Sequence, residues 1–207
     1  MKNPDYWQDS LQYLTSADKT LGDVISQHKD YSITARGEAY ETLLRAIVGQ
    51  QISVKAAASV WNKIIGLIKI IEPNKVLSTS KEKLKLCGLS KQKTQYILNI
   101  SEHFKINNII DDTYWENRTY LSVYEELITI KGIGPWTAEM FGMFYLLEKD
   151  IFPLKDVGIL RAMYQLYNNG ERIDIDKIVK ISDTWKPSRS VACWFLWRSI
   201  DSEEVLY

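Results

Sequence analysis

Apolar side chains recur every three or four residues along most of this chain, the spacing of helices that bury one face. In residues 38–51 the apolar face is formed by Tyr40, Leu43, Leu44, Ile47 and Val48. A second such run follows Ser53, a residue type that caps helix N-termini, and continues to Ile64. The pattern predicts that most of the chain is helical.

Polar residues and glycines divide this pattern into segments. Ser80 and Ser90 stand where N-caps are expected, and Gly88 follows the first of these two helices. The expected helices cover residues 5–14, 38–51, 54–64, 81–86, 91–100, 120–127, a segment starting at 135, 157–166, 174–185 and 187–200. Only the run from Asp30 to Thr34 is moderately β-prone, and it is short. The predicted fold class is therefore all-α.

Length and composition are those of a small globular protein. The chain has 207 residues, of which 45% are hydrophobic, enough for one or two small domains. No stretch is long and apolar enough to span a bilayer, and residues 1–5 open a polar segment rather than a signal peptide. We therefore expect a soluble, cytoplasmic protein, associated with the nucleoid if its source is bacterial.

The side chains that usually bind metals are scarce. Cys87 and Cys193 are too few for an iron–sulfur cluster held by four thiolates, and no Cys/His spacing suits zinc. The two histidines, His28 and His103, stand alone in the sequence. We expect two buried free thiols and no metal held by side chains.

The charge balance gives no simple indication of the partner. The chain has 26 basic and 26 acidic residues and a formal net charge of zero, whereas DNA-binding domains often carry a basic surface. Residues 81–93 are basic and residues 111–126 are acidic. This separation suits a protein with one DNA-facing side, and it equally suits two ordinary solvated helices.

A tight glycine turn joins two of the expected helices at Gly132-Ile133-Gly134-Pro135. Glycine permits unusual backbone angles and close approach, and proline suits the first position of a helix. The N–H groups at the start of such a helix can bind a phosphate, with Ile133 anchoring the turn in the core. A plain steric corner between two helices would use the same glycines, so the turn alone leaves both interpretations open.

Four segments in order resemble one known family. The turn in residues 130–139, with Asp156 downstream, is similar to the hairpin of the helix-hairpin-helix DNA glycosylase superfamily. Residues 41–58 (ETLLRAIVGQQISVKAAA) resemble its wedge-bearing segment, and 86–97 (LCGLSKQKTQYI) the helix pair that follows. Residues 185–198 (WKPSRSVACWFLWR) resemble the closing helix of DNA-3-methyladenine glycosylase II.

The resemblance covers most of the chain and implies a fold. It matches the compact members, which lack an N-terminal β-rich domain. It implies a helix-hairpin-helix glycosylase unit over residues 1–207, with two helical lobes and an active-site cleft between them. Residues 1–36 and 157–207 would form one lobe, and residues 37–156, ending in the hairpin, the other.

Asp156 is the expected catalytic residue. Aspartate is also a common helix N-cap, and the two roles are compatible because a helix N-terminus stabilises the charged carboxylate. Positive charge grows on the sugar as a base leaves, and a carboxylate stabilises that charge or activates the attacking water. In family members that also cut the strand, a lysine follows the hairpin glycines. Trp136 stands there, so the resemblance implies a monofunctional enzyme.

The resemblance also assigns the base pocket and the DNA contacts. Trp136 and Trp197 align with pocket positions, and Met140 and Val157 occupy two further pocket positions that are often aromatic in relatives. Gln51 is the expected wedge that fills the space of a flipped base. The remaining expected DNA contacts are Gly132, Ile133, Gly134, Thr137, Ala138, Ser53, Lys131 and Arg189. Lys131 is alternatively a solvated residue, and Arg189 alternatively pairs with a carboxylate within the fold.

The sequence therefore predicts a monofunctional DNA glycosylase of base excision repair that acts on alkylated purines such as 3-methyladenine and 7-methylguanine. The expected partner is damaged double-stranded DNA, bound by a monomer. We expect no cofactor; the resemblance adds a monovalent cation bound by hairpin carbonyls, which no side chain indicates. Two alternatives stay open: a glycosylase for uracil, hypoxanthine or an oxidised purine, and a non-catalytic lesion-binding protein.

Overall fold

The fold is helical, as predicted. The computed structural model describes residues 4–28, 32–33 and 37–200. Within these ranges every regular element is a helix and no strand occurs, which confirms the all-α class. The β-prone run from Asp30 to Thr34 lies mostly outside the described residues. No described helix combines the length and the apolar character needed to cross a membrane.

The chain divides into two compact units. Among the described residues, the first contains residues 4–28, 32–33 and 146–200, and the second contains residues 37–145. The predicted lobe boundary after residue 156 differs from this division, because hydrogen bonds tie residues 149–151 to the first unit. The Ser190 hydroxyl accepts the N–H of Ile151 at 2.9 Å, and the Ser190 N–H donates to the carbonyl of Lys149 at 3.1 Å.

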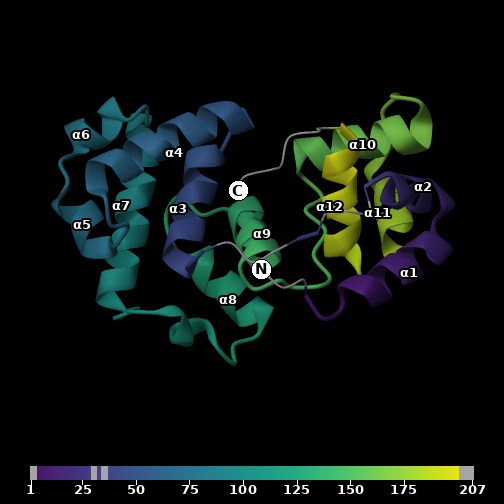
Figure 1. The fold of residues 1–207 in the computed structure, drawn as a ribbon, viewed down its shortest axis with the longest axis horizontal. Coiled ribbons are helices and arrows are strands. Elements are labelled where there is room, and N and C mark those ends of the chain that lie inside the picture. The colour runs from purple at the N-terminus through teal and green to yellow at the C-terminus, as the bar shows by residue number, and fades with distance from the viewer. Residues whose placement is uncertain (1–3, 29–31, 34–36, 201–207) are drawn as a thin grey trace. The chain divides into compact units, whose positions relative to one another are not determined.

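The second unit consists of eight helical elements, of which the first is the central one (Figure 1). They are α3 (Ala39–Gly49), α4 (Val54–Ile68), α5 (Pro73–Ser78), α6 (Lys81–Leu86), α7 (Lys91–Ile106), the 3-10 helix η1 (Asp112–Trp115), α8 (Tyr120–Leu127) and α9 (Pro135–Phe144). α3 packs against α4, α7 and α9, while α8 packs against α9. The predicted serine caps are confirmed: Ser53, Ser80 and Ser90 accept the first N–H groups of α4, α6 and α7.

The first unit surrounds its last helix. It contains α1 (Trp7–Ala17), α2 (Lys19–Gln27), α10 (Val157–Asn168), α11 (Ile175–Asp183) and α12 (Arg189–Ile200). α12 packs against α1, α2 and α10, and its residues from Ser190 to Arg198 are all buried. Phe195 of α12 stacks on Trp7 of α1 with ring centroids 5.8 Å apart. This buried helix supplies Trp197, and α10 begins directly after Asp156.

Two α-helices and the 3-10 helix η1 fall outside the predicted set. Only Asp18 separates α2 from α1; its carboxylate caps α2 by accepting the N–H of Leu21 at 3.0 Å. Pro73 is the first residue of the six-residue helix α5. α5 has only six residues, so apolar spacing is weak in it. α2 does carry apolar residues at helical spacing, Leu21, Val24 and Ile25, although no helix was expected there.

Candidate functional site

The hairpin between α8 and α9 requires glycine at one position. Gly132 has a φ of +116°, and a Cβ there would lie 2.2 Å from Cγ of Tyr96 on α7. Ile133 is 4% exposed and anchors the turn in the core, as expected. A Cβ on Gly134 would meet no atom within 4 Å, so this face of the hairpin is open. Gly132 thus serves packing within the fold, whereas Gly134 leaves room for another molecule.

Side-chain amides from two other helices hold the hairpin backbone. Asn99 of α7 donates to the carbonyl of Lys131 at 2.7 Å. Gln50, at the end of α3, donates to the carbonyl of Gly132 at 3.4 Å and to the hydroxyl of Thr137 at 3.0 Å. Sequence reasoning missed both amides. The only available signal was the position of Gln50 beside the expected wedge.

A charged cluster holds α8 against α7 and against the residues that precede α8. Glu126 of α8 accepts hydrogen bonds from His103, Tyr114 and Arg118, with Arg118 Nη1 2.5 Å from its Oε2. Burial tends to raise the pKa of Glu126, but these three donors outweigh it and hold the pKa below its ordinary value. The helix that leads into the hairpin is therefore fixed by an ionised side chain.

Hydrogen bonds within the fold reduce the number of N–H groups that the hairpin can offer to a phosphate. The N–H of Ile133 donates to Ile130 at 2.9 Å, and the N–H of Ala138 donates to Gly134 at 3.1 Å. The Thr137 side chain is buried and accepts from Gln50. The predicted contacts through Ile133, Ala138 and the Thr137 hydroxyl are therefore revised, because these groups are already used. Among the described residues, the N–H groups of Gly134 and Thr137 are left at the start of α9.

The expected wedge residue lies beside the hairpin. Gln51 is exposed and has a left-handed backbone with a φ of 57°, which is unusual for a residue other than glycine. It borders a hollow of about 460 Å³ together with Gln50, Lys93, Tyr96 and the hairpin glycines. Such strained backbone is often found at functional sites. The structure thus brings the predicted wedge and the predicted phosphate-binding turn together.

Three other predicted DNA contacts differ in their surroundings. The Lys131 side chain is exposed, which suits both a DNA contact and a solvated surface residue. Ser53 accepts the N–H of Ala56 at 3.3 Å as the cap of α4. The predicted DNA contact through Arg189 is revised, because its guanidinium pairs with Asp150 at 2.7 and 2.9 Å. Arg189 follows its second alternative, an ion pair within the fold.

Asp156 lies at the start of α10 with one oxygen fixed from two sides. Its Oδ1 accepts the N–H of Ile159 at 2.8 Å and the indole N–H of Trp197 at 3.0 Å. The residue is 7% exposed and Trp197 is 4% exposed. The predicted N-cap role is confirmed. The indole edge of Trp197 points at the carboxylate, so Trp197 orients Asp156.

Glycine at position 158 allows this arrangement. A Cβ on Gly158 would lie 3.0 Å from Cδ1 of Trp197 and 3.1 Å from Oδ1 of Asp156. These distances are tighter than nine in ten real Cβ contacts, so a larger residue would require the indole or the carboxylate to shift by a few tenths of an ångström. Gly158 therefore belongs to the functional site, although the sequence offered no sign of it beyond its closeness to Asp156.

The predicted pocket residues divide between the two units. Trp136, which is half-buried, and Met140 belong to α9, while Val157 and Trp197 belong to the first unit with Asp156. Met140 is 1% exposed, and its place in the base pocket stays a prediction. Val157 is 79% exposed. Of these residues, Trp197 donates a hydrogen bond to the candidate catalytic carboxylate at 3.0 Å.

The described residues contain no group of three or more His, Cys, Asp or Glu side chains able to hold a metal. Cys87 and Cys193 are buried and are not joined in a disulfide. The carbonyls of Ile130, Lys131 and Gly132 accept hydrogen bonds from protein donors. Each of these carbonyls already accepts one hydrogen bond, and the monovalent cation at the hairpin stays a prediction.

Comparisons with known proteins agree with this architecture. A family model described as the HhH-GPD superfamily of base excision DNA repair proteins matches residues 44–187. A 3-methyladenine DNA glycosylase of Schizosaccharomyces pombe, solved with abasic DNA, is 26% identical with a TM-score of 0.85, covering 92% of this chain and 96% of that chain. A DNA-3-methyladenine glycosidase of Bacillus halodurans is 31% identical with a TM-score of 0.76, covering 96% and 92%. An alkylbase DNA glycosidase-like protein of S. pombe is 28% identical and covers 95% of each chain.

Proposed function

The chain belongs to the HhH-GPD superfamily of base excision DNA repair proteins, and we propose that it is a monofunctional DNA glycosylase for alkylated purines. The observation that carries the proposal is the buried carboxylate of Asp156, held at the start of α10 by the indole of Trp197. Relatives named as 3-methyladenine glycosylases support the substrate class.

Binding uses the hairpin and the loop beside it. The open face of Gly134 and the first turn of α9 receive a phosphate of the damaged strand through backbone N–H groups. Gln51 enters the duplex and fills the space of the flipped nucleotide. Gln50 holds Gln51 and the hairpin in fixed positions relative to each other, because hydrogen bonds from its side-chain amide join the end of α3 to the hairpin.

The reaction breaks the bond between C1′ of the sugar and the base nitrogen. The bonding electron pair leaves with the base, and a purine that alkylation has made cationic departs as a neutral molecule. Asp156 stabilises the positive charge that develops on the sugar, or takes the proton of the water that attacks C1′. Water supplies the new C1′–O bond, and an abasic site remains. No cofactor is part of this reaction.

The absence of a lysine after the hairpin glycines predicts that the strand stays intact. Strand-cutting relatives form a Schiff base between an amine and the sugar. Trp136 occupies that position here, and an indole forms no such bond. Its aromatic face instead suits a cationic purine. Borohydride treatment of the reaction should trap no covalent adduct, and a trapped adduct would contradict this part of the proposal.

The test of the proposal is to incubate the protein with methylated DNA and identify the bases released by chromatography. We expect 3-methyladenine and 7-methylguanine. Release of uracil, hypoxanthine or an oxidised purine alone, from duplexes with one defined lesion, would replace the substrate class and keep the reaction. Tight binding to these duplexes without any release would favour the non-catalytic alternative.

We propose a cytoplasmic monomer, and light scattering of the protein bound to a short duplex would report its stoichiometry.

A further inference from the structure

α10 presents an exposed row of side chains that starts directly after the catalytic carboxylate. Val157, the first residue of the helix, is 79% exposed, although it is apolar. Arg161 and Gln165 are exposed, and Leu160 and Tyr164 are half-buried. These spacings of three and four residues place the side chains along one part of the helix surface. Folding of the unit does not account for the exposure of Val157.

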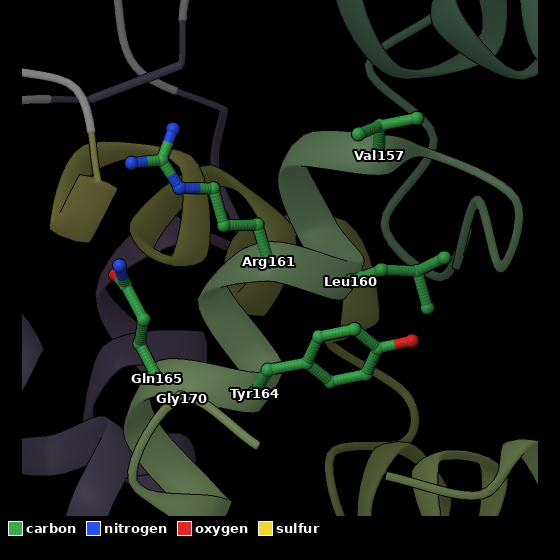
Figure 2. A pocket seen from close by; sticks show the side chains of 6 residues that line it. All are labelled: Val157, Leu160, Arg161, Tyr164, Gln165 and Gly170. Atoms are coloured by element: carbon green, nitrogen blue, oxygen red, sulfur yellow. The ribbon is translucent and has the colours of Figure 1, made fainter. Parts of the chain in front are cut away.

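A groove follows this row. Its volume is about 350 Å³, and its lining is formed by Val157, Leu160, Arg161, Tyr164, Gln165 and Gly170. Figure 2 shows Leu160 and Tyr164 on one side of α10 and Arg161 and Gln165 on the other, with Val157 at the start of the helix. The groove therefore has an apolar, aromatic side and a polar side that carries a cation.

The charge along α10 is entirely positive. Arg161 is the only charged residue in the helix, and the groove has no acidic lining residue. Within the described part of the chain Arg161 forms no ion pair, in contrast to Arg189, whose guanidinium is held by Asp150. In a chain of zero net charge, an arginine with no ion pair among the described residues, five positions after the catalytic carboxylate, indicates an anionic partner.

We propose that this groove binds the sugar-phosphate backbone of the DNA strand next to the damaged nucleotide, with Arg161 on a phosphate and Tyr164 against a sugar or base. The proposal rests on the proposed function, because Asp156 reaches C1′ only if the strand passes the start of α10. Arg161 lies five residues further, about 7.5 Å along the helix axis. A strand advances about 3.4 Å per nucleotide, so this distance corresponds to a phosphate one or two nucleotides from the lesion.

The experiment compares the salt dependence of binding to a short duplex with one abasic site. The variants are Arg161→Gln, Tyr164→Ala and, as a control, Lys177→Gln, which removes an exposed positive charge from α11 in the same unit. We expect Arg161→Gln to lower the slope of log affinity against log salt by about 1, the value for one lost phosphate contact. Tyr164→Ala should weaken binding several-fold without changing the slope, and Lys177→Gln should behave as the parent.

Base release by the parent from methylated DNA is measured alongside. If the parent releases bases and Arg161→Gln retains the parental slope and affinity, the groove does not bind DNA and the glycosylase proposal stands. If Arg161→Gln has a lower slope but the parent releases no base, the groove binds DNA and the proposed function is wrong. Equal loss of slope in Lys177→Gln would mean that overall charge, and not this groove, governs binding, which would also overturn the inference. Circular dichroism melting verifies that each variant is folded.

Discussion

Replacing Trp197 with phenylalanine should slow base excision while leaving DNA affinity unchanged. The substitution keeps an aromatic ring in place and removes the N–H that lies 3.0 Å from Oδ1 of Asp156. The bond from the Ile159 N–H at 2.8 Å remains, so the carboxylate keeps one of these two donors. The carboxylate then loses its fixed orientation toward the sugar, and the reaction rate reports that loss.

The size of the effect follows from the strength of the missing bond. A hydrogen bond to a charged group contributes about 1.5–3 kcal/mol. Each 1.36 kcal/mol in the barrier changes a rate about tenfold. If the bond acts fully in the transition state, single-turnover excision of 3-methyladenine should slow by about ten- to a hundredfold. The dissociation constant for an abasic duplex should stay within about twofold of the parent, because the indole lies under the carboxylate rather than on the surface.

Trp61→Phe is the matched control. Trp61 is 4% exposed, as Trp197 is, and its Nε1 is buried without a hydrogen-bond partner. Both variants lose similar packing, so thermal melting should show comparable destabilisation and only Trp197→Phe should lose rate. Gly158→Ala should also lower the rate, since its methyl group would lie 3.0–3.1 Å from the indole and the carboxylate. A folded Trp197→Phe protein that excises at the parental rate would refute the orienting role.

Three further changes test the supports of the hairpin. Gln50→Ala should lower stability by about 1 kcal/mol and DNA affinity several-fold, since two hydrogen bonds to the hairpin are lost; unchanged melting and binding would contradict this. Gly132→Ala should destabilise the protein by at least about 3 kcal/mol in urea unfolding, because its Cβ would overlap Tyr96, whereas Gly66→Ala in the last turn of α4, where a Cβ would meet no atom, should stabilise it by about 0.5–1 kcal/mol. Glu126 has a pKa held below its ordinary value of 4.5 by three donors that outweigh burial, so its contribution to stability is present above that value and is lost as the pH falls through the lowered pKa. Glu126→Gln should therefore reduce stability at about pH 7 and make it less sensitive to acid, and parallel pH curves for variant and parent would contradict this.

Local features were predictable from the sequence. The caps at Ser53, Ser80, Ser90 and Asp156 depend on hydrogen bonds to backbone groups three residues away, and the structure confirms all four. The all-α class followed from apolar spacing in long helices. The six-residue helix α5 was missed because so few residues show no clear period, whereas α2 was missed although Leu21, Val24 and Ile25 have helical spacing.

The contacts that shape the site join residues far apart in the chain. Trp197 and Asp156 are 41 residues apart, and Gln50 and Gly132 are 82 residues apart. No local rule pairs such side chains, so the sequence indicated Trp197 only as an aromatic pocket residue and gave Gln50 no role in the hairpin. The ion pair of Arg189 with Asp150, 39 residues away, was one of two alternatives, and only the packed structure distinguishes them.

The most direct test of the account is single-turnover excision of 3-methyladenine from a defined duplex by the parent and by Asp156→Asn. Asparagine keeps the size of the side chain and an oxygen for the Ile159 and Trp197 donors, and it removes the negative charge. The account predicts base release by the parent, a rate at least about a hundredfold lower in the variant, and equal binding of an abasic duplex. Excision by Asp156→Asn at the parental rate would contradict the central claim that the charge of Asp156 drives the reaction.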